Sequence, residues 1–211
     1  MYVPSAHEEH DRGTLHRLIA AHPLGTLITT SGNELVANHV PFILQPEQGE
    51  LGTLICHVAR ANPVWRELSQ ERNSLVVFQG ANTYITPSWY PSKHAHGRVV
   101  PTWNYAVVHV RGIPRIIEDR AWLIAQVHAL TGIHEAEQPA PWRVTDAPAE
   151  FIDRMLQMIV GIEIPIAQLT GKWKVSQNRA HEDKQGVVHG LATRNGTRDA
   201  EMASMVERFV E

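Results

Sequence analysis

The first third of the chain is a series of short strand-like segments separated by tight turns, and this pattern restricts the fold more than any other feature. Strands are predicted at residues 25–30, 35–44 and 51–58, with turns at 31–33 and 48–50. Strands this close in sequence, joined by turns this short, pair with their neighbours in an antiparallel way. We therefore expect an antiparallel meander or barrel rather than a doubly wound sheet.

Later segments extend this pattern and add helices. Further strands are predicted at residues 75–79, 83–86, 99–110, 112–117 and 161–169, with Gly80 separating the first two and a tight turn pairing the third with the fourth. Helices are predicted after caps at Asp11, Asn62 and Asp146, at 119–130, and from Thr197. The expected fold class is mainly β with flanking α-helices. It forms one domain over residues 1–211, with a C-terminal helical segment at about 180–211.

Composition limits the location and the partners of this protein. No apolar run approaches the ~20 residues that span a bilayer, and the N-terminus lacks the basic and apolar regions of a signal peptide. The one cysteine, Cys56, lies in an apolar run, which favours a buried thiol and a reducing compartment. We therefore expect a cytoplasmic protein with no membrane partner. The formal net charge of −3, without a DNA-reading motif, argues against direct DNA binding.

The 13 histidines invite a metal or haem interpretation. They are scattered, and the closest pair, His94 and His96, lies in a segment with no evident third ligand. No metal site is predicted. The chain also lacks a hydrolase signature and a glycine-rich phosphate loop, so no catalytic residues are assigned. Any chemistry would therefore have to come from a bound cofactor.

The segment from His57 to Pro63 contains a strand end, Arg60 and a helix start at Asn62. A helix N-terminus offers free N–H groups and partial positive charge to an anion, and His57 and Arg60 could add charge-assisted bonds. A capped helix with a surface arginine explains the segment about equally well. His39, on the preceding strand, could donate to the same ligand or be a half-buried histidine with a protein partner.

Two other segments combine tryptophan, cationic, and amide or hydroxyl side chains: Ser88 to Tyr105, and Gly171 to Arg179. Tryptophan offers a flat face to a planar ring, the cations attract an anion, and the amides donate directional bonds. Flavin mononucleotide (FMN) is a planar ligand with an acidic tail. The candidate ligand residues are Lys93, Trp103, Asn104, Lys172, Trp173, Ser176, Gln177 and Arg179. The alternatives are a core role for Trp103 and Tyr105, and a basic surface hairpin for the second segment.

These motifs resemble the PaiB family, bacterial proteins described as FMN-binding negative transcriptional regulators of protease synthesis and sporulation. The resemblance rests on Met1–Pro4, His57–Pro63, Pro87–Tyr90, Val100–Tyr105 and Gly171–Arg179. It implies an antiparallel split β-barrel of the flavin-reductase and pyridoxamine-phosphate-oxidase type. It also implies a homodimer with FMN at the subunit interface.

The leading hypothesis is therefore a cytoplasmic FMN-binding split-barrel protein whose regulatory effect is indirect. Two alternatives stay open: a flavin-dependent oxidoreductase, and a haem-binding protein of haem utilisation on the same fold. In the leading hypothesis the phosphate of FMN lies near His57, Arg60 and the helix start at Asn62.

Overall fold

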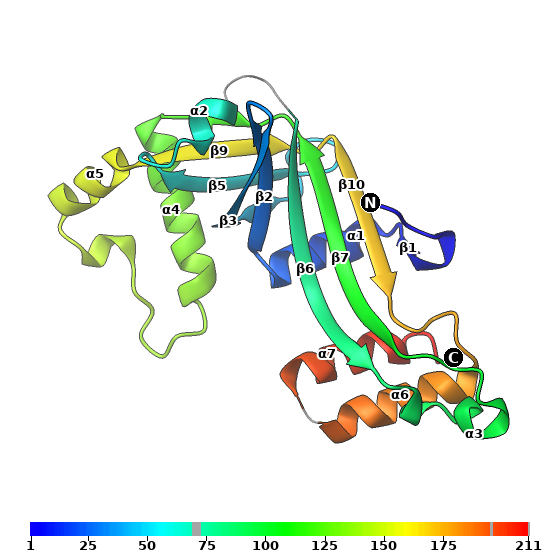
Figure 1. Cartoon of the computed structure of the whole chain (residues 1–211). Helices are drawn as coiled ribbons and strands as arrows, with labels where there is room; N and C mark the ends of the chain where they lie inside the picture. The colour runs from blue at the N-terminus through cyan, green and yellow to red at the C-terminus, as the bar shows by residue number, and fades with distance from the viewer. Residues whose placement is uncertain (69–72, 195, 211) are drawn as a thin grey trace. The chain divides into compact units, whose positions relative to one another are not determined.

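The computed structural model describes residues 1–68, 73–194 and 196–210 (Figure 1). The strands are β1 (Glu8–Glu9), β2 (Leu24–Ser31), β3 (Glu34–Pro41), β4 (Ile43–Gln45), β5 (Thr53–Ala59), β6 (Ser74–Ile85), β7 (Thr102–Gly112), β8 (Arg115–Ile117), β9 (Ile159–Pro165) and β10 (Gln168–Lys174). The helices are α1 (Arg12–Ala21), α2 (Val64–Leu68), α3 (Ser92–His96), α4 (Arg120–Glu135), α5 (Ala149–Gln157), α6 (His181–Arg194) and α7 (Thr197–Glu207).

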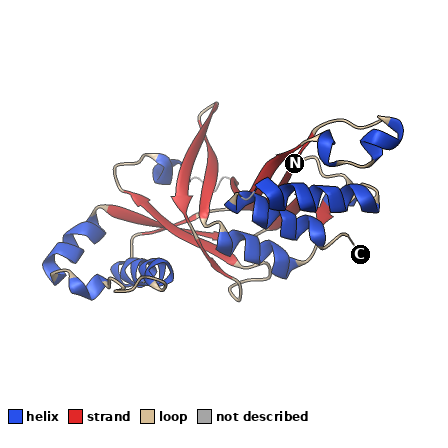
Figure 2. Cartoon of the chain, turned by 90° about the horizontal axis from the view of Figure 1, so that it is seen from below, coloured by secondary structure: helices blue, strands red, loops and turns tan. Residues whose placement is uncertain are grey.

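The strands form two sheets, and helices flank them (Figure 2). One sheet has the strand order β1-β10-β7-β6-β2-β3, and the other has the order β4-β5-β9-β8. The β2–β3 hairpin shows how the turns fix the register, because it runs from Leu24 opposite Pro41 to Ser31 opposite Glu34. Gly32 lies in its turn with φ +58°, a conformation that glycine adopts at no steric cost. The antiparallel arrangement and this turn agree with the sequence prediction.

The chain divides into two compact units, each built from separate segments. Unit 1 contains Met1–His22, Phe78–His109 and Thr170–Glu211, and unit 2 contains Pro23–Val77 and Val110–Leu169. Each unit has its own buried apolar side chains.

The core of unit 2 is built on the β5–β9 pair, which runs from Thr53 opposite Pro165 to Ala59 opposite Ile159. Alternate side chains of this pair are buried: Leu54, Cys56, Val58, Val160, Ile162 and Ile164. Burial raises the pKa of the Cys56 thiol. The thiol therefore stays protonated and unreactive, as the sequence predicted.

Helix α1 of unit 1 is capped by Asp11, whose Oδ2 accepts a hydrogen bond from the N–H of Thr14 at 2.7 Å. This is the predicted N-cap. The helix buries Leu15, Leu18 and Ile19, which is the apolar face that the sequence indicated.

Residues 35–44 do not form the single strand that was predicted. β3 ends at Pro41 and β4 begins at Ile43, and the two strands belong to different sheets. The Phe42 N–H between them donates to the Pro23 carbonyl at 2.8 Å, and β4 pairs with β5. The chain thus changes sheets at Phe42, even though its apolar alternation continues.

Two other strand predictions were also wrong. Gly80 does not interrupt β6; instead, its missing side chain leaves room for α1, because a Cβ there would lie 3.0 Å from Leu18 Cδ1. The strand following β7 is shorter than predicted, at Arg115–Ile117, and it does not pair with β7. It pairs with β9 in the four-stranded sheet.

Two helix boundaries also differ from prediction. α4 continues past Gly132 to Glu135, so that glycine does not end the helix. Asp146 does not cap α5, because Pro148 occupies the N-cap position and Asp146 Oδ2 accepts instead from the Arg143 N–H at 2.9 Å.

Within the described ranges, no helix combines the length and the apolar character needed to cross a membrane.

Candidate functional site

The ligand residues predicted from the sequence fall into two sets, one in each compact unit. The set in unit 2 is His39, His57, Arg60 and Asn62. The set in unit 1 is Lys93, Trp103, Asn104, Lys172, Trp173, Ser176, Gln177 and Arg179.

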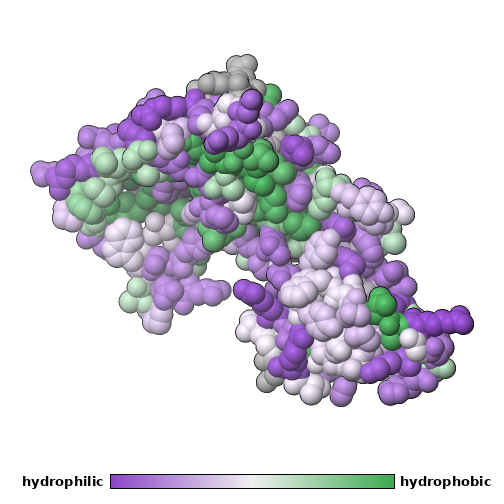
Figure 3. Space-filling view, in the orientation of Figure 1, coloured by the Kyte–Doolittle hydropathy of each residue, from purple (hydrophilic) through white to green (hydrophobic). Residues whose placement is uncertain are grey.

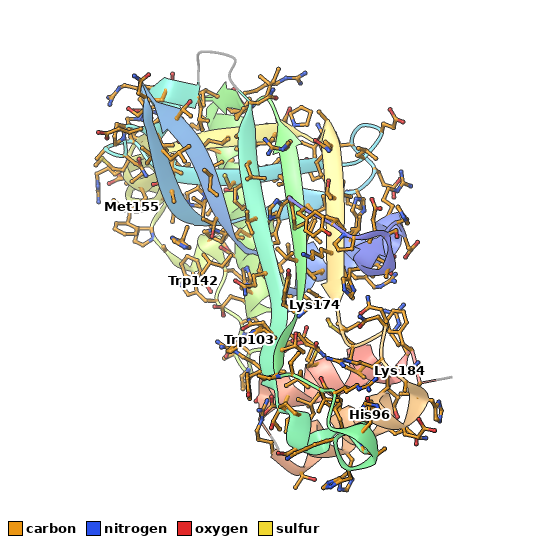
Figure 4. The ribbon with its side chains drawn as sticks, turned by 45° about the vertical axis from the view of Figure 1, so that its right-hand side comes forward. His96, Trp103, Trp142, Met155, Lys174 and Lys184 are labelled. Carbon is orange, nitrogen blue, oxygen red and sulfur yellow. The ribbon has the colours of Figure 1, made fainter. Side chains whose placement is uncertain are left out.

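Neighbouring strands β7 and β10 of unit 1 bring two lysines against two aromatic side chains. Lys172 Nζ lies 5.3 Å from the centre of the Tyr105 ring. Lys174 Nζ donates to the Trp103 carbonyl at 2.8 Å and also to the hydroxyl of Thr102. Figure 4 shows Lys174 and Trp103 close together on these strands. We call Trp103, Tyr105, Lys172 and Lys174 the lysine–aromatic cluster.

The aromatic side chains of this cluster are accessible to a ligand. Trp103 is 51% exposed, and its ring meets the ring of Tyr84 edge-on, with centroids 6.2 Å apart. Tyr105 is half-buried. The alternative that Trp103 and Tyr105 are core residues is therefore wrong for Trp103. The buried member of this stretch is Asn104, on the opposite face of the strand.

Positive charge is concentrated at the cluster. Burial of the Lys174 ammonium lowers its pKa, and the neighbouring charges of Lys172 and Arg179 act in the same direction, whereas Tyr105 opposes them. Crowded cations of this kind favour a bound anion, because its charge offsets their mutual repulsion. The cluster thus offers a planar aromatic surface and an anion site together.

Strand alternation places Trp173 on the other face of β10 from the two lysines. It is 4% exposed and lines a small cavity with Leu18 of α1 and Met205 of α7. Trp173 is therefore a core side chain in this structure. Lys174 and Tyr105 were not among the predicted ligand residues, although the same two-residue alternation, counted from Lys172 and Trp103, would have identified them.

A hydrogen bond between Asn104 and Ser176 stabilises the turn that follows β10. Asn104 is fully buried, and its Nδ2 donates to Ser176 Oγ at 2.9 Å. Ser176 has φ +64° and is the one non-glycine residue with positive φ in the described part of the chain. Gln177 closes the same turn, since its Oε1 accepts from the Val175 N–H at 2.8 Å and its Nε2 donates to the Trp173 carbonyl. These three side chains fix the shape of the turn.

Arg179 lies at the end of that turn, and Lys93 lies on α3 of the same unit. The Arg179 guanidinium stacks over the Tyr90 ring at 4.8 Å. Lys93 is exposed on α3, and its Nζ donates to Ser88 Oγ at 3.2 Å. Arg179 therefore adds to the positive charge that Lys174 experiences, as its effect on the lysine pKa shows.

In unit 2 the Arg60 guanidinium is already occupied by protein acceptors. Its Nη1 contacts Glu118 Oε2 at 2.5 Å, its Nε donates to the Gln157 carbonyl at 2.9 Å, and its Nη2 donates to the Ile159 carbonyl at 3.2 Å. An anion at this position would have to displace Glu118.

His57 and Gln126 form a polar contact between β5 and α4. His57 Nδ1 lies 2.7 Å from Gln126 Oε1, and an amide oxygen only accepts, so we assign the proton to Nδ1. Gln126 is 2% exposed, and its Nε2 has no hydrogen-bond partner among the described residues. This leaves one buried donor and the His57 Nε2 lone pair available to a ligand.

Asn62 caps α2 as predicted, because its Oδ1 accepts from the Val64 N–H at 3.0 Å. Its Nδ2 donates to Asn38 Oδ1 at 2.9 Å. The Nδ2 of Asn38 is buried and has no partner among the described residues. His39, next to Asn38 on β3, is exposed and lies opposite Thr26 of β2.

The described residues contain no group of three histidine, cysteine, aspartate or glutamate side chains that could hold a metal ion. His94 and His96 are exposed on α3.

Comparisons with known proteins identify a protein family and several relatives. A family model described as “Putative FMN-binding domain” matches residues 1–168. An uncharacterized protein of Emericella nidulans is 35% identical over 228 residues, covering 90% of each chain. The Protease synthase and sporulation protein PAI 2 of Bacillus subtilis is 27% identical, covering 98% of this chain and 97% of its own.

Two solved structures share the fold. The flavocytochrome Anf3 from Azotobacter vinelandii has a TM-score of 0.60 at 12% identity, covering 79% of this chain and 69% of its own. The FAD and heme binding protein from Mycobacterium smegmatis has a TM-score of 0.55 at 17% identity, covering 79% and 72%. At these identities the likeness shows the fold alone.

Proposed function

The chain belongs to the FMN-binding family whose model spans its residues 1–168, and on this premise we propose that it is a cytoplasmic, homodimeric FMN-binding protein. The predicted family, the antiparallel flavin-binding fold class and the flavin cofactor are confirmed. The dimer and the cytoplasmic location extend the proposal beyond the family. The location is supported by a single cysteine, which is buried.

The lysine–aromatic cluster is the observation that supports this function best. A flavin has a planar ring, which Trp103 and Tyr105 can face, and a phosphate, which Lys172 and Lys174 can bind. The cluster therefore fits a flavin. A bound flavin supplies electron transfer, and the residues named here bind and orient it.

We place the phosphate at the two lysines rather than at Arg60. The acceptors of the two lysines are uncharged: Lys174 donates to the Thr102 hydroxyl and the Trp103 carbonyl, and Lys172 donates to the Tyr2 carbonyl. The pKa of Lys174 is held low by burial and by its cationic neighbours. Arg60, in contrast, already has a carboxylate and two carbonyls as partners. An anion at the lysines relieves repulsion, whereas an anion at Arg60 must replace an existing ion pair.

Lys174→Gln is expected to weaken FMN binding by about 1–3 kcal/mol, because it removes a charge-assisted contact. Titration of the purified protein with FMN, followed by flavin fluorescence, measures the affinity. Arg198→Gln is a suitable control, since Arg198 is an exposed arginine of α7 that belongs neither to the cluster nor to the apolar surface of α5. Unchanged affinity in Lys174→Gln, with a loss in Arg60→Ala, would move the phosphate to the segment that the sequence first suggested.

A dimer is expected to appear in light scattering at micromolar concentration as a particle of twice the 23.7 kDa chain mass. Exposed apolar side chains support this proposal, among them Leu35 of β3, Phe151 and Met155 of α5, and Met158 directly after α5. Figure 3 shows apolar surface on the side that carries α5. Such patches on a folded chain commonly mark protein interfaces. A monomer that binds FMN with full affinity would refute the dimer.

Any regulatory effect of this protein is proposed to be indirect. The chain has a net charge of −3, and the concentrated cations of the lysine–aromatic cluster lie at the proposed ligand site. DNA binding needs several basic contacts to phosphate, which these residues would not supply while holding a flavin.

The visible spectrum of the purified protein with added FMN or haemin separates a flavoprotein from a haem protein. Reduction by a nicotinamide cofactor tests for an oxidoreductase.

A further inference from the structure

Two adjoining cavities lie between α4 and α5 in unit 2. The first has a volume of about 250 Å³, and its walls include Arg60, Glu118, Leu123 and Leu156. The second has a volume of about 310 Å³, and its walls include Ile124, Val144, Ala147 and Ile152. Arg120 and Asp153 line both cavities. We call the two cavities together the α4–α5 groove. Its first end is mostly polar, and its second end is mostly apolar, although His128 and Thr145 also line that end.

The apolar end of the groove is left unfilled by the protein itself. α4 buries only Leu123 and Gln126, and α5 buries only Leu156, although both helices carry many apolar side chains. Ile124 and Ile152 are half-buried along the second cavity. Protein interiors are normally close-packed, so a cavity with such walls suits an apolar group.

At the centre of the groove, Arg120 and Asp153 form an ion pair in which a ligand carboxylate can take the place of Asp153. Arg120 reaches from α4 to Asp153 on α5 through one guanidinium nitrogen. The two side chains are 67% and 48% exposed, so the pair contributes little to stability. A guanidinium has five donors in a planar fork that matches a carboxylate, and one contact leaves most of them free.

We propose that the α4–α5 groove binds an amphipathic monocarboxylate of the size of a medium-chain fatty acid. The carboxylate takes the place of Asp153 at Arg120, and the hydrocarbon chain lies along Ile124, Val144 and Ile152. Glu118 stays with Arg60 and closes the polar end of the groove. This site lies wholly in unit 2 and uses none of the lysine–aromatic cluster, so it does not depend on the proposed flavin function.

Calorimetric titration of the full chain with octanoate tests the proposal. Octanoate is expected to bind saturably, whereas acetate, which lacks the tail, and octylammonium, which has the opposite charge, are not. Arg120→Gln should weaken octanoate binding by about tenfold or more, because it removes the charged donor. Arg154→Gln is the matched control: it is an exposed arginine of α5 that lines neither cavity, and it should leave binding unchanged.

Asp153→Asn tests whether the Asp153 carboxylate competes with the ligand carboxylate for Arg120 or only supports the fold. The variant removes the charge that holds Arg120, so octanoate should bind about twofold to fivefold more tightly. Weaker octanoate binding in Asp153→Asn, unchanged binding in Arg120→Gln, or equal binding of octylammonium would each overturn the proposal. Thermal unfolding of each variant confirms that it is folded before it is titrated.

Discussion

Gly186→Ala is expected to lower the free energy of unfolding by about 3 kcal/mol, because α6 packs directly on the backbone at Trp89. A Cβ at Gly186 would lie 1.9 Å from the Trp89 carbonyl oxygen. A Cβ at Gly190, one turn further along, would lie 2.3–2.5 Å from atoms of the Trp89 indole. Real Cβ contacts are not this short, and a backbone carbonyl cannot turn aside like the end of a flexible side chain. The helix must therefore move away.

Urea denaturation measures this loss, and Gly132→Ala provides the control. Gly132 lies inside α4, and no atom would come within 4 Å of an added Cβ. Alanine favours a helix over glycine by about 1 kcal/mol, so this variant should be slightly stabilised. A Gly186→Ala protein as stable as the wild type would show that α6 does not approach Trp89 this closely.

Elements whose signal is local were predicted well from the sequence. The Asp11 cap and the leucines after it specify α1, and Asn62 caps α2, because a cap acts within a few residues of itself. The change of sheets at Phe42 is different in kind. The alternation of apolar residues continues through that residue, and the position of the break depends on pairing with Pro23 and with β5.

In the candidate site, too, local features could be predicted from the sequence, and contacts with distant residues could not. An arginine beside a helix start is visible in the sequence, but the acceptors that occupy Arg60 come from Glu118, Gln157 and Ile159, far along the chain. Trp173 resembles a ligand residue because of its polar neighbours. Its side chain nevertheless points to the core, since a strand turns successive side chains to opposite faces.

The buried network around Asp199 is expected to make the protein sensitive to acid. Asp199 is 8% exposed and accepts hydrogen bonds from Arg194 Nε at 2.8 Å and from the Thr83 hydroxyl at 3.0 Å. The hydrogen bonds from Arg194, followed by the one from Thr83, hold the pKa of this carboxyl below its usual value. Its charged form is therefore more stable in the folded than in the unfolded protein.

Asp199→Asn is expected to cost about 2 kcal/mol at pH 7, since it leaves the half-exposed Arg194 without its carboxylate. The unfolded chain takes up a proton at Asp199 near the ordinary value of 3.8, before the folded chain does. The stability from this pair is thus present above that pKa and is lost as the pH falls through it towards the lower, folded pKa. Urea unfolding at pH 7 and at pH 3 should show that the difference in unfolding free energy between wild type and variant shrinks in acid.

Glu207→Gln is the control, at an exposed acid at the end of the same helix, and its unfolding free energy should match that of the wild type at both pH values. A gap of equal size at both pH values would mean that the network is held by hydrogen bonding and shape rather than by the charge of Asp199.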